Sequence, residues 1–372
     1  MKKTDTGVYY NNGGGARTAA AYGFMGKRAY ISGFLARAFF PGVLLCCASL
    51  SLAASPGTTS ANFLKIPVAA VPTGLGEAYT AMVGPDSILY NPAGLGLLSY
   101  NSFSGTHNQY FRGVTQEYAA ASYRAPFGTI GLGFSSLSSG KIDAYDKNDM
   151  PVGRTSTSHQ LWLLSYSQSW PHFNDDIGML DPMLISPSWT NVYPVKRYRP
   201  KAFRLALGVS VRRISETLDR YSAETYACDF GALLVLPHHF HLGVSALNLG
   251  GKQKFVRESY SLPGELRFGL AKDLHSRNNT MVFTLASDLI KYSDNSIFSA
   301  TGLEADILKM FQVRIGYKTQ KDSGSHLSGG IGMNFDRLSD KTSFIHGARL
   351  DYSYMDYGAL GATSRIGVQF IW

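Results

Sequence analysis

The chain has 372 residues, of which only 16% are charged, and it is rich in Gly (39), Tyr (22) and Phe (21). Its net charge is +9, but six basic residues and one acidic residue fall within residues 1–54, and the remaining charge forms no basic run, which argues against nucleic-acid binding. Downstream of this leader, no stretch approaches the roughly 20 apolar residues of a spanning helix. A charge-poor, aromatic-rich chain with a mean hydropathy of −0.07 is typical of a transmembrane β-barrel.

Residues 1–54 have the order of a secretory signal peptide. Basic residues come first, and the apolar stretch AFFPGVLLCCASLSLAA (38–54) then ends in small residues, where we expect cleavage. Met25 is an alternative start of translation, and the paired cysteines leave a lipoprotein signal as an alternative that the leucines before them disfavour. Removal of the signal leaves Cys228 alone, so we expect no internal disulfide.

The stretch GPDSILYNPAGLG (84–96) fits no ordinary element. Pro85 and Pro92 exclude a regular helix, and Asn91-Pro92 marks a change of chain direction. Because the stretch is largely apolar, we expect a buried turn. Just before it, GLGEAYTAM (74–82) predicts a short helix with one apolar face.

From residue 101 onward, apolar and polar residues alternate with a period of two. In FRLALGVSVRR (203–213), the apolar side chains share one face, and Arg204, Gly208 and Arg212 share the other. Several segments run about ten residues, as tilted membrane strands do, against five or six in soluble sheets. We therefore predict an all-β fold, an antiparallel transmembrane β-barrel of about 14 strands. The expected strands are 101–110, 115–124, 128–138, 156–168, 201–214, 222–236, 240–250, 265–274, 279–291, 296–306, 311–320, 326–336, 342–354 and 363–372.

Two segments interrupt this pattern. Residues 139–155 are interpreted as a polar surface loop, and residues 169–200 as an insertion too long for a hairpin turn. Counting strands from a periplasmic start places the insertion on the periplasmic side, together with both ends of the mature chain. Since the insertion is apolar, we expect it to cover the barrel floor, and docking of a periplasmic partner is the alternative.

The last strand reaches the final residue and ends on aromatic side chains. Phe370 and Trp372 share one face of it, as expected of a signal for the barrel-assembly machinery. Membership of the interfacial aromatic belt is the simpler interpretation of Trp372, and the two roles are compatible.

The blocks GTTSANFLKIP (57–67), TGLGEAYTAM (73–82) and YNPAGL (90–95), followed by this barrel, resemble the PorV/PorQ-like outer-membrane proteins. These belong to the FadL-type long-chain fatty-acid transporter superfamily. The resemblance implies a barrel of about fourteen strands over 101–372, with 55–100 folded inside as a plug containing a small helix.

We expect the plug to gate access to the lumen, and residues of the plug and of the barrel lumen are candidates for the gate and for ligand contacts. The expected plug or gate residues are Gly74, Gly76, Tyr79, Asn91, Pro92, Ala93 and Gly94. The expected ligand contacts are Phe63, Leu64, Ile66, Leu75, Arg204 and Arg314. For each arginine, ordinary polar lining is the alternative to orienting an anionic head group.

The function that this implies is passive uptake of hydrophobic or amphipathic molecules across the outer membrane of a diderm bacterium, with long-chain fatty acids as the implied substrate. The alternative is a PorV-type scaffold or shuttle in protein secretion. We expect no enzyme, cofactor or metal site, because catalytic motifs are missing and the histidines of HHFH (238–241) do not complete a metal shell. The expected partners are outer-membrane lipid and a hydrophobic small molecule.

Overall fold

The computed structural model describes residues 57–171, 203–255, 257–276, 280–320, 327–335 and 347–372. The signal peptide and residues 172–200 of the insertion lie outside the described residues, so the expectations for them stay predictions. The described start of the insertion, Ser169 and Trp170, belongs to a barrel strand.

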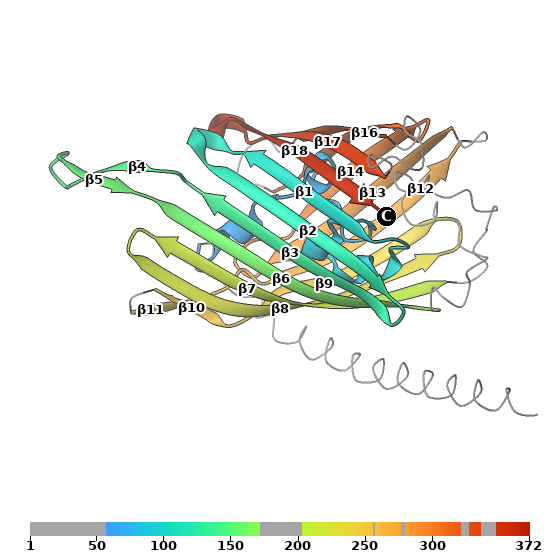
Figure 1. Ribbon diagram of the computed structural model, residues 1–372, viewed down its shortest axis with the longest axis horizontal. Helices are drawn as coiled ribbons and strands as arrows, with labels where there is room; N and C mark the ends of the chain where they lie inside the picture. The colour runs from blue at the N-terminus through green and yellow to red at the C-terminus, as the bar shows by residue number, and fades with distance from the viewer. Residues whose placement is uncertain (1–56, 172–202, 256, 277–279, 321–326, 336–346) are drawn as a thin grey trace, which may run out of the picture. The chain divides into compact units, whose positions relative to one another are not determined.

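Fourteen antiparallel strands close into a barrel (Figure 1). The barrel closes where β1 pairs with β18, with Ser102 opposite Ile371 and Gln109 opposite Ser364. The order around the barrel is β1-β18-β17-β16-β15-β14-β13-β12-β9-β8-β7-β6-β3-β2. The strands are β1 (Ser102–Gln109), β2 (Thr115–Ala125), β3 (Gly128–Ser138), β6 (Thr157–Trp170), β7 (Arg204–Leu218), β8 (Tyr221–Leu236), β9 (Phe240–Gly250), β12 (Glu265–His275), β13 (Met281–Tyr292), β14 (Phe298–Ile307), β15 (Phe311–Lys318), β16 (Leu327–Asn334), β17 (Ala348–Asp356) and β18 (Ala362–Ile371).

The side chains alternate between the two faces of the wall as the sequence predicts. Phe203 and Ile315 point outward and are 63% and 54% exposed, whereas Arg314 on β15 points inward and is 3% exposed. An apolar outer face around a polar lumen is the arrangement of a transmembrane β-barrel, so the predicted fold class is confirmed. None of the described helices is long and apolar enough to span a membrane.

Two small hairpins lie at the barrel end opposite Trp372, here called the hairpin end (Figure 1). One pairs β4 (Ile142–Tyr145) with β5 (Pro151–Thr155), and the other pairs β10 (Lys252–Phe255) with β11 (Glu258–Ser261). The sequence pattern predicts no strand in either stretch. In the first, Asp146 Oδ1 accepts hydrogen bonds from the backbone N–H groups of Asn148 and Met150, at 2.8 and 2.9 Å, and this turn brings the two short strands together.

Short helical segments inside the barrel carry residues 62–97. They are η1 (Asn62–Lys65), α2 (Ala70–Gly74), α3 (Ser87–Tyr90) and η2 (Pro92–Leu97), and two further turns, η3 (Phe111–Gly113) and η7 (Gly358–Leu360), link barrel strands. Asn91 precedes η2, and its side chain accepts a hydrogen bond from Ala93 N, so the turn around Pro92 is capped by its own side chain. This corner is buried, as predicted.

The predicted helix over 74–82 is wrong, because the helix lies earlier, at α2. Gly76 has a φ of 65°, and its N–H donates to Thr73 O while Glu77 N–H donates to Pro72 O. These two bonds form a Schellman motif, which ends a helix at a glycine in the left-handed region. The stretch that reads as an apolar helical face is therefore a helix stop followed by turns.

The plug backbone lies directly against the barrel wall at lumen-facing glycines. These glycines form cross-strand pairs, namely Gly208 with Gly231, Gly243 with Gly269, and Gly302 with Gly316. A Cβ added at Gly316 would lie 2.1 Å from Gly76 N, and one at Gly243 would lie 2.3 Å from Thr80 O. At these glycine pairs the plug backbone therefore occupies the space that a side chain would fill.

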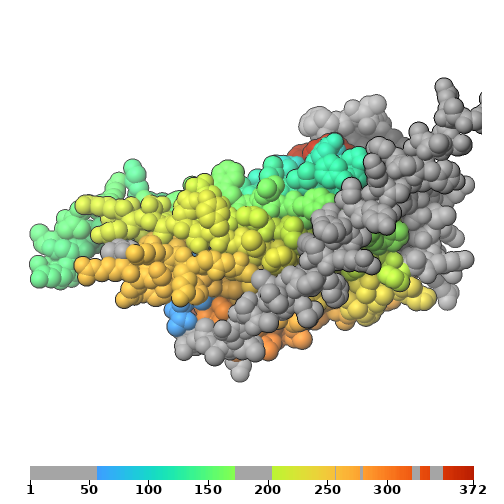
Figure 2. Space-filling view, turned by 90° about the horizontal axis from the view of Figure 1, so that it is seen from below, coloured from blue at the N-terminus to red at the C-terminus, as the bar shows by residue number. Residues whose placement is uncertain are grey.

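The plug enters the barrel from the hairpin end. Thr59 bridges to Ser261 of β11, whereas Trp372 exchanges backbone hydrogen bonds with Asn101 at the other end. Figure 2 shows the blue start of the described chain reaching the surface beside the orange strands. The expectation that both ends of the mature chain share one side is therefore wrong for residues 57–65, because these residues pair with the hairpin-end loops.

A methyl group at Gly316 tests this fit. Gly316→Ala should destabilise the folded barrel by about 1–3 kcal/mol, because the added methyl group overpacks the lumen. The folded barrel migrates faster than the unfolded chain on electrophoresis, and the variant should lose this fast-migrating band at a lower temperature. Gly329→Ala is the matched control, since its Cβ would face the outside and meet nothing closer than Arg314 O at 3.7 Å. Equal transition temperatures for the two variants would contradict the close fit.

Candidate functional site

The candidate site is a cavity between the plug and the hairpin-end half of the barrel wall. Its volume is about 30 Å³. This volume is well below the roughly 150 Å³ of an apolar protein cavity that binds benzene. The lining residues are Phe63, Leu64, Ile66, Val68, Glu77, Leu89, Tyr90, Gln116, Ser135, Leu161, Arg212, Glu265, Arg267 and Tyr292.

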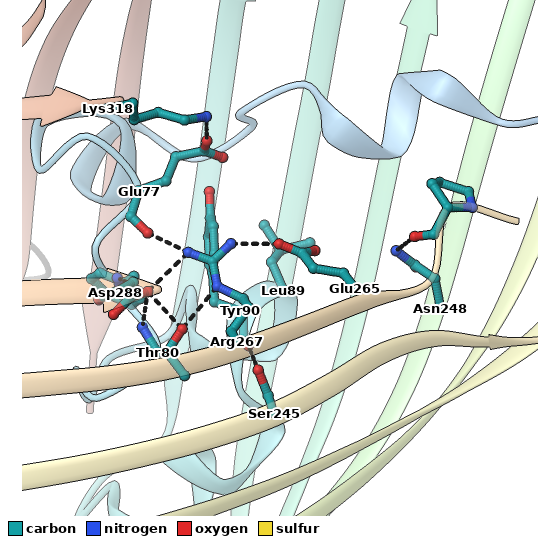
Figure 3. Close-up of polar contacts among 12 residues, drawn as sticks. Glu77, Thr80, Leu89, Tyr90, Ser245, Asn248, Glu265, Arg267, Asp288 and Lys318 are labelled. Carbon is teal, nitrogen blue, oxygen red and sulfur yellow. Dashed lines mark hydrogen bonds and ion pairs between the residues drawn. The ribbon is translucent and has the colours of Figure 1, made fainter. Parts of the chain in front are cut away.

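Arg267 of β12 lines this cavity, and Figure 3 shows its polar contacts. Its Nη1 donates to Glu265 at 2.7 Å, and its Nη2 donates to Asp288 of β13 at 2.9 Å and to the carbonyl oxygen of Glu77. Its Cζ lies 5.1 Å from the centre of the Tyr90 ring. The guanidinium is therefore fully engaged by the wall and the plug, with two carboxylates to balance its charge.

Asp288 holds the plug to the wall from the same cluster (Figure 3). One carboxylate oxygen accepts hydrogen bonds from the backbone N–H groups of Tyr79 and Thr80, at 3.1 and 3.0 Å, and from the Thr80 hydroxyl at 2.6 Å. Glu77 pairs with Lys318 of β15. The plug turn after α2 is thus fixed by two buried carboxylates.

Arg212 of β7 is the second cationic residue of the cavity lining. Its Nε donates to the buried Asp229, and its Nη2 donates to the carbonyl oxygen of Leu89 at 3.1 Å. Each cavity arginine therefore has a carboxylate partner. Among the described residues of the whole barrel, eleven acidic side chains are buried against seven Arg and Lys side chains, so buried acids outnumber buried bases.

Residues 57–68, here called the lid, cover the cavity and make few hydrogen bonds and ion pairs with the barrel. Lys65 Nζ lies 2.7 Å from Asp294, which also accepts a hydrogen bond from the Thr59 hydroxyl. Arg365 donates to the carbonyl oxygen of Pro67 at 3.0 and 3.2 Å. The Phe63 ring stacks on His159, with the ring centres 5.1 Å apart.

Asp294 lies in the loop between β13 and β14, and the direction of its pKa shift indicates that its carboxylate is charged and pairs with Lys65 of the lid at neutral pH. Burial alone would raise this pKa, but hydrogen bonds from Lys65 and Thr59 outweigh burial and lower the pKa below its ordinary value of 3.8. A lowered pKa contributes stability that is present above the ordinary pKa and is lost as the pH falls through the folded value. The Lys65–Asp294 ion pair is therefore fully formed at pH 7 and is lost only in strong acid, as the pH falls through the lowered pKa of Asp294.

Residues 70–98, here called the seat, are held more extensively. Asn91 Nδ2 donates to Thr80 O and to Ala232 O of β8, at 2.8 and 3.1 Å. Ser245 of β9 donates to Tyr90 O at 2.7 Å, and Ser167 of β6 donates to Ala93 O at 3.1 Å. Added to Asp288 and the glycine contacts, these bonds attach the seat to strands around much of the barrel.

The structure brings only half of the predicted ligand contacts to the cavity. Phe63, Leu64 and Ile66 line it. Leu75 lies instead in the seat against Gly302, where a Cβ would come 2.5 Å from Leu75 O. Arg314 pairs with Glu304 and Asp351 and is not part of the lining.

Arg204 is buried at the end of the barrel where β7 begins and is also absent from the cavity lining. The cavity lining also contains Gln116, Ser135 and Glu265, which are not among the predicted contacts. Alternation marks all three as lumen-facing, but it does not tell at which depth along the barrel axis each one lies.

The predicted gate residues all belong to the seat. Gly74, Tyr79 and Pro92 are buried, and Gly94 has Ser87 Oγ 2.5 Å from the place of a Cβ. The remaining members, Gly76, Asn91 and Ala93, take part in the contacts described above. The predicted residues are thus brought together, in the tightly held part of the plug.

At the other end of the barrel, Phe370 of β18 packs on Phe103 of β1, with ring centres 6.5 Å apart, and Trp372 is 61% exposed. Their role as an assembly signal stays a prediction. Within the part of the chain that the structure describes, no group of three or more His, Cys, Asp and Glu residues is placed to bind a metal ion.

No family model and no curated protein matches the sequence. Among solved structures, the chain is similar to the Pseudomonas putida toluene transporter TodX, with 10% identity over 82% of this chain and 96% of that one and a TM-score of 0.48. It is also similar to the Ralstonia pickettii toluene transporter TbuX, with 12% identity over 82% and 98% of the chains and a TM-score of 0.47.

A Pseudomonas aeruginosa FadL homologue shows 10% identity over 82% of this chain and 98% of that one, with a TM-score of 0.44. At these identities and TM-scores the likenesses carry no argument about ligand or mechanism. The site is therefore interpreted from its own geometry.

Removing the charge of Asp288 tests its role as the anchor of the seat. Asp288→Asn should destabilise the folded barrel by about 3 kcal/mol, because Arg267 and the plug N–H groups lose a buried carboxylate. Asp143→Asn is the control, because its pair with Arg154 is exposed and contributes little. Equal urea midpoints for the two variants would show that Asp288 is not an anchor.

Proposed function

We propose that the chain is an outer-membrane barrel of the FadL type for passive uptake of hydrophobic molecules, in which the plug acts as the gate. The observation that carries the proposal is the cavity between the plug and the wall, where apolar side chains of the lid face Leu89 of the seat and Leu161 of the wall. A site for a hydrophobic molecule needs such an apolar lining, screened from water, with a few polar groups. The resemblance in sequence to the PorV/PorQ-like proteins points to the same superfamily.

The gate that the contacts favour is the lid, and the seat is the fixed part. The seat lies against wall glycines and has its backbone bonded to several strands. The lid depends on one partly exposed ion pair, between Lys65 and Asp294, and on a few hydrogen bonds. Displacing it enlarges the cavity without breaking the buried charge cluster at Arg267.

Long-chain fatty acids are the substrate that the resemblance implies. The charges around the cavity do not favour a carboxylate, since both lining arginines already have carboxylate partners. The proposed substrate is therefore a hydrophobic molecule, and nothing in the lining requires it to carry a carboxylate.

A scaffold or shuttle role in protein secretion is the second candidate. One observation favours it, since the cavity of about 30 Å³ is far smaller than the roughly 150 Å³ of a cavity that binds benzene. The two candidates differ in uptake. If the protein is a scaffold, deleting its gene leaves the rate of entry of a hydrophobic compound unchanged. If it is a transporter, deleting its gene slows that entry.

Locking the lid tests gating. Thr59 and Ser261 form a β-bridge, so cysteines at both positions are near enough for a disulfide. In a Cys228→Ser background, the oxidised double-cysteine protein should lose most uptake of a radiolabelled hydrophobic compound by cells with an intact outer membrane. Reduction should restore it, and the two single-cysteine variants serve as controls. Full uptake by the oxidised protein would show that the lid is not the gate.

Membrane orientation is tested by labelling intact cells with a membrane-impermeant maleimide, again without Cys228. Asn148→Cys, in the β4–β5 turn at the hairpin end, should be labelled. Phe127→Cys, in the β2–β3 turn at the opposite end, should be labelled only after the outer membrane is permeabilised, because short turns face the periplasm. The reverse pattern would invert the topology.

A further inference from the structure

One polar group in the cavity lining has a hydrogen-bonding atom without a partner. Gln116 of β2 points into the lumen and is 1% exposed. Its Oε1 accepts a hydrogen bond from Asn108 Nδ2 at 2.9 Å, whereas its Nε2 has no hydrogen-bond partner among the described residues. Buried donors are rarely left unpaired, so this amide N–H is a candidate contact for a ligand.

The surroundings of Gln116 suit a molecule that is mostly apolar. Phe63 and Leu64 of the lid and Leu161 of β6 line the same cavity, and Ser135 of the neighbouring strand β3 adds a hydroxyl group. An apolar body can therefore contact the lid and the wall while one polar group reaches the amide N–H.

The charges of the lining disfavour an anionic head group. Glu77 and Glu265 contribute carboxylates to the cavity, and Arg212 and Arg267 contribute the cations. Counting the bonded partners Asp229, Asp288 and Lys318 as well, four acidic groups stand against three basic ones. An incoming carboxylate would compete with these carboxylates for arginines that are already paired, and its own desolvation would be uncompensated.

We propose that Gln116 Nε2 donates a hydrogen bond to the oxygen of an uncharged hydrophobic molecule, such as an aliphatic alcohol or ketone, and that the site discriminates against fatty-acid carboxylates. This inference rests on the proposed function and deepens it, because it names the head group that the cavity accepts. Gln116 is thus a specificity-determining residue, and the lid residues supply contacts that any apolar chain satisfies.

The test compares three probes that share one chain length, namely 1-octanol, octane and octanoate at pH 7. Equilibrium dialysis of the purified full-length mature protein in detergent gives each Kd. The wild type should bind 1-octanol about fivefold more tightly than octane, the usual net effect of one hydrogen bond, and octanoate at least about tenfold more weakly than 1-octanol.

Gln116→Leu should lower the ratio of the octane Kd to the 1-octanol Kd from about five to about one, because the amide N–H that distinguishes the two probes is removed. Gln312→Leu is the matched control, since Gln312 is a buried, lumen-facing glutamine outside the cavity lining, and its preference should equal that of the wild type. A change in electrophoretic mobility on heating confirms that each variant is folded before it is heated.

A preference for 1-octanol that persists in Gln116→Leu would overturn the role of Gln116. Octanoate binding as tightly as 1-octanol in the wild type would overturn the discrimination against anions. In either case octane still binds, so the proposed function survives. Failure of the wild type to bind any of the three probes would instead reject the proposed function and this inference with it.

Discussion

The plug can occupy the lumen only if its backbone polar groups find partners on the barrel wall, and the rest of the structure depends on this constraint. An unpaired buried N–H or C=O group is costly, and the seat contains little regular helix to pair its own. Asp288 accepts hydrogen bonds from the backbone N–H groups of Tyr79 and Thr80, and Ser245 donates one to the carbonyl oxygen of Tyr90. The glycine pairs of the wall allow the close approach that these bonds need.

The same constraint explains why the lumen is rich in charge although the chain is poor in it. Donors and acceptors on the strands must match those of an irregular segment, and each buried charge then needs its own partner. Arg267 illustrates this, since it bonds Glu77 O and Thr80 of the plug and is balanced by Glu265 and Asp288. Such clusters hold one arrangement of the seat, because breaking a buried pair is costly.

Lid and seat therefore differ in how much must be broken to move them. Moving the seat would separate buried ion pairs and plug backbone from several strands at once. Moving the lid would separate the Lys65–Asp294 pair, in which Lys65 is 20% exposed, together with a few hydrogen bonds at the hairpin end. The residues held by fewer polar contacts thus include Phe63, Leu64 and Ile66, which line the cavity.

The sequence by itself determined the barrel. Alternation with a period of two places Phe203 outside and Arg212 inside, because successive side chains of a strand point to opposite faces, and this rule needs no knowledge of the neighbouring strands. The buried Asn91-Pro92 corner was also predictable, since its cap is local.

Only the tertiary structure decided the site. Depth along the barrel axis follows from strand register and from the path of the plug, so it brings Gln116 and Arg267 to the cavity and leaves Arg204 and Arg314 elsewhere. The helix over 74–82 failed for a related reason, because apolar spacing did not reveal that Gly76 adopts a positive φ and that Glu77 pairs with Lys318 across the lumen. Contacts between residues far apart in the chain decide such features, and a pattern within one segment does not contain them.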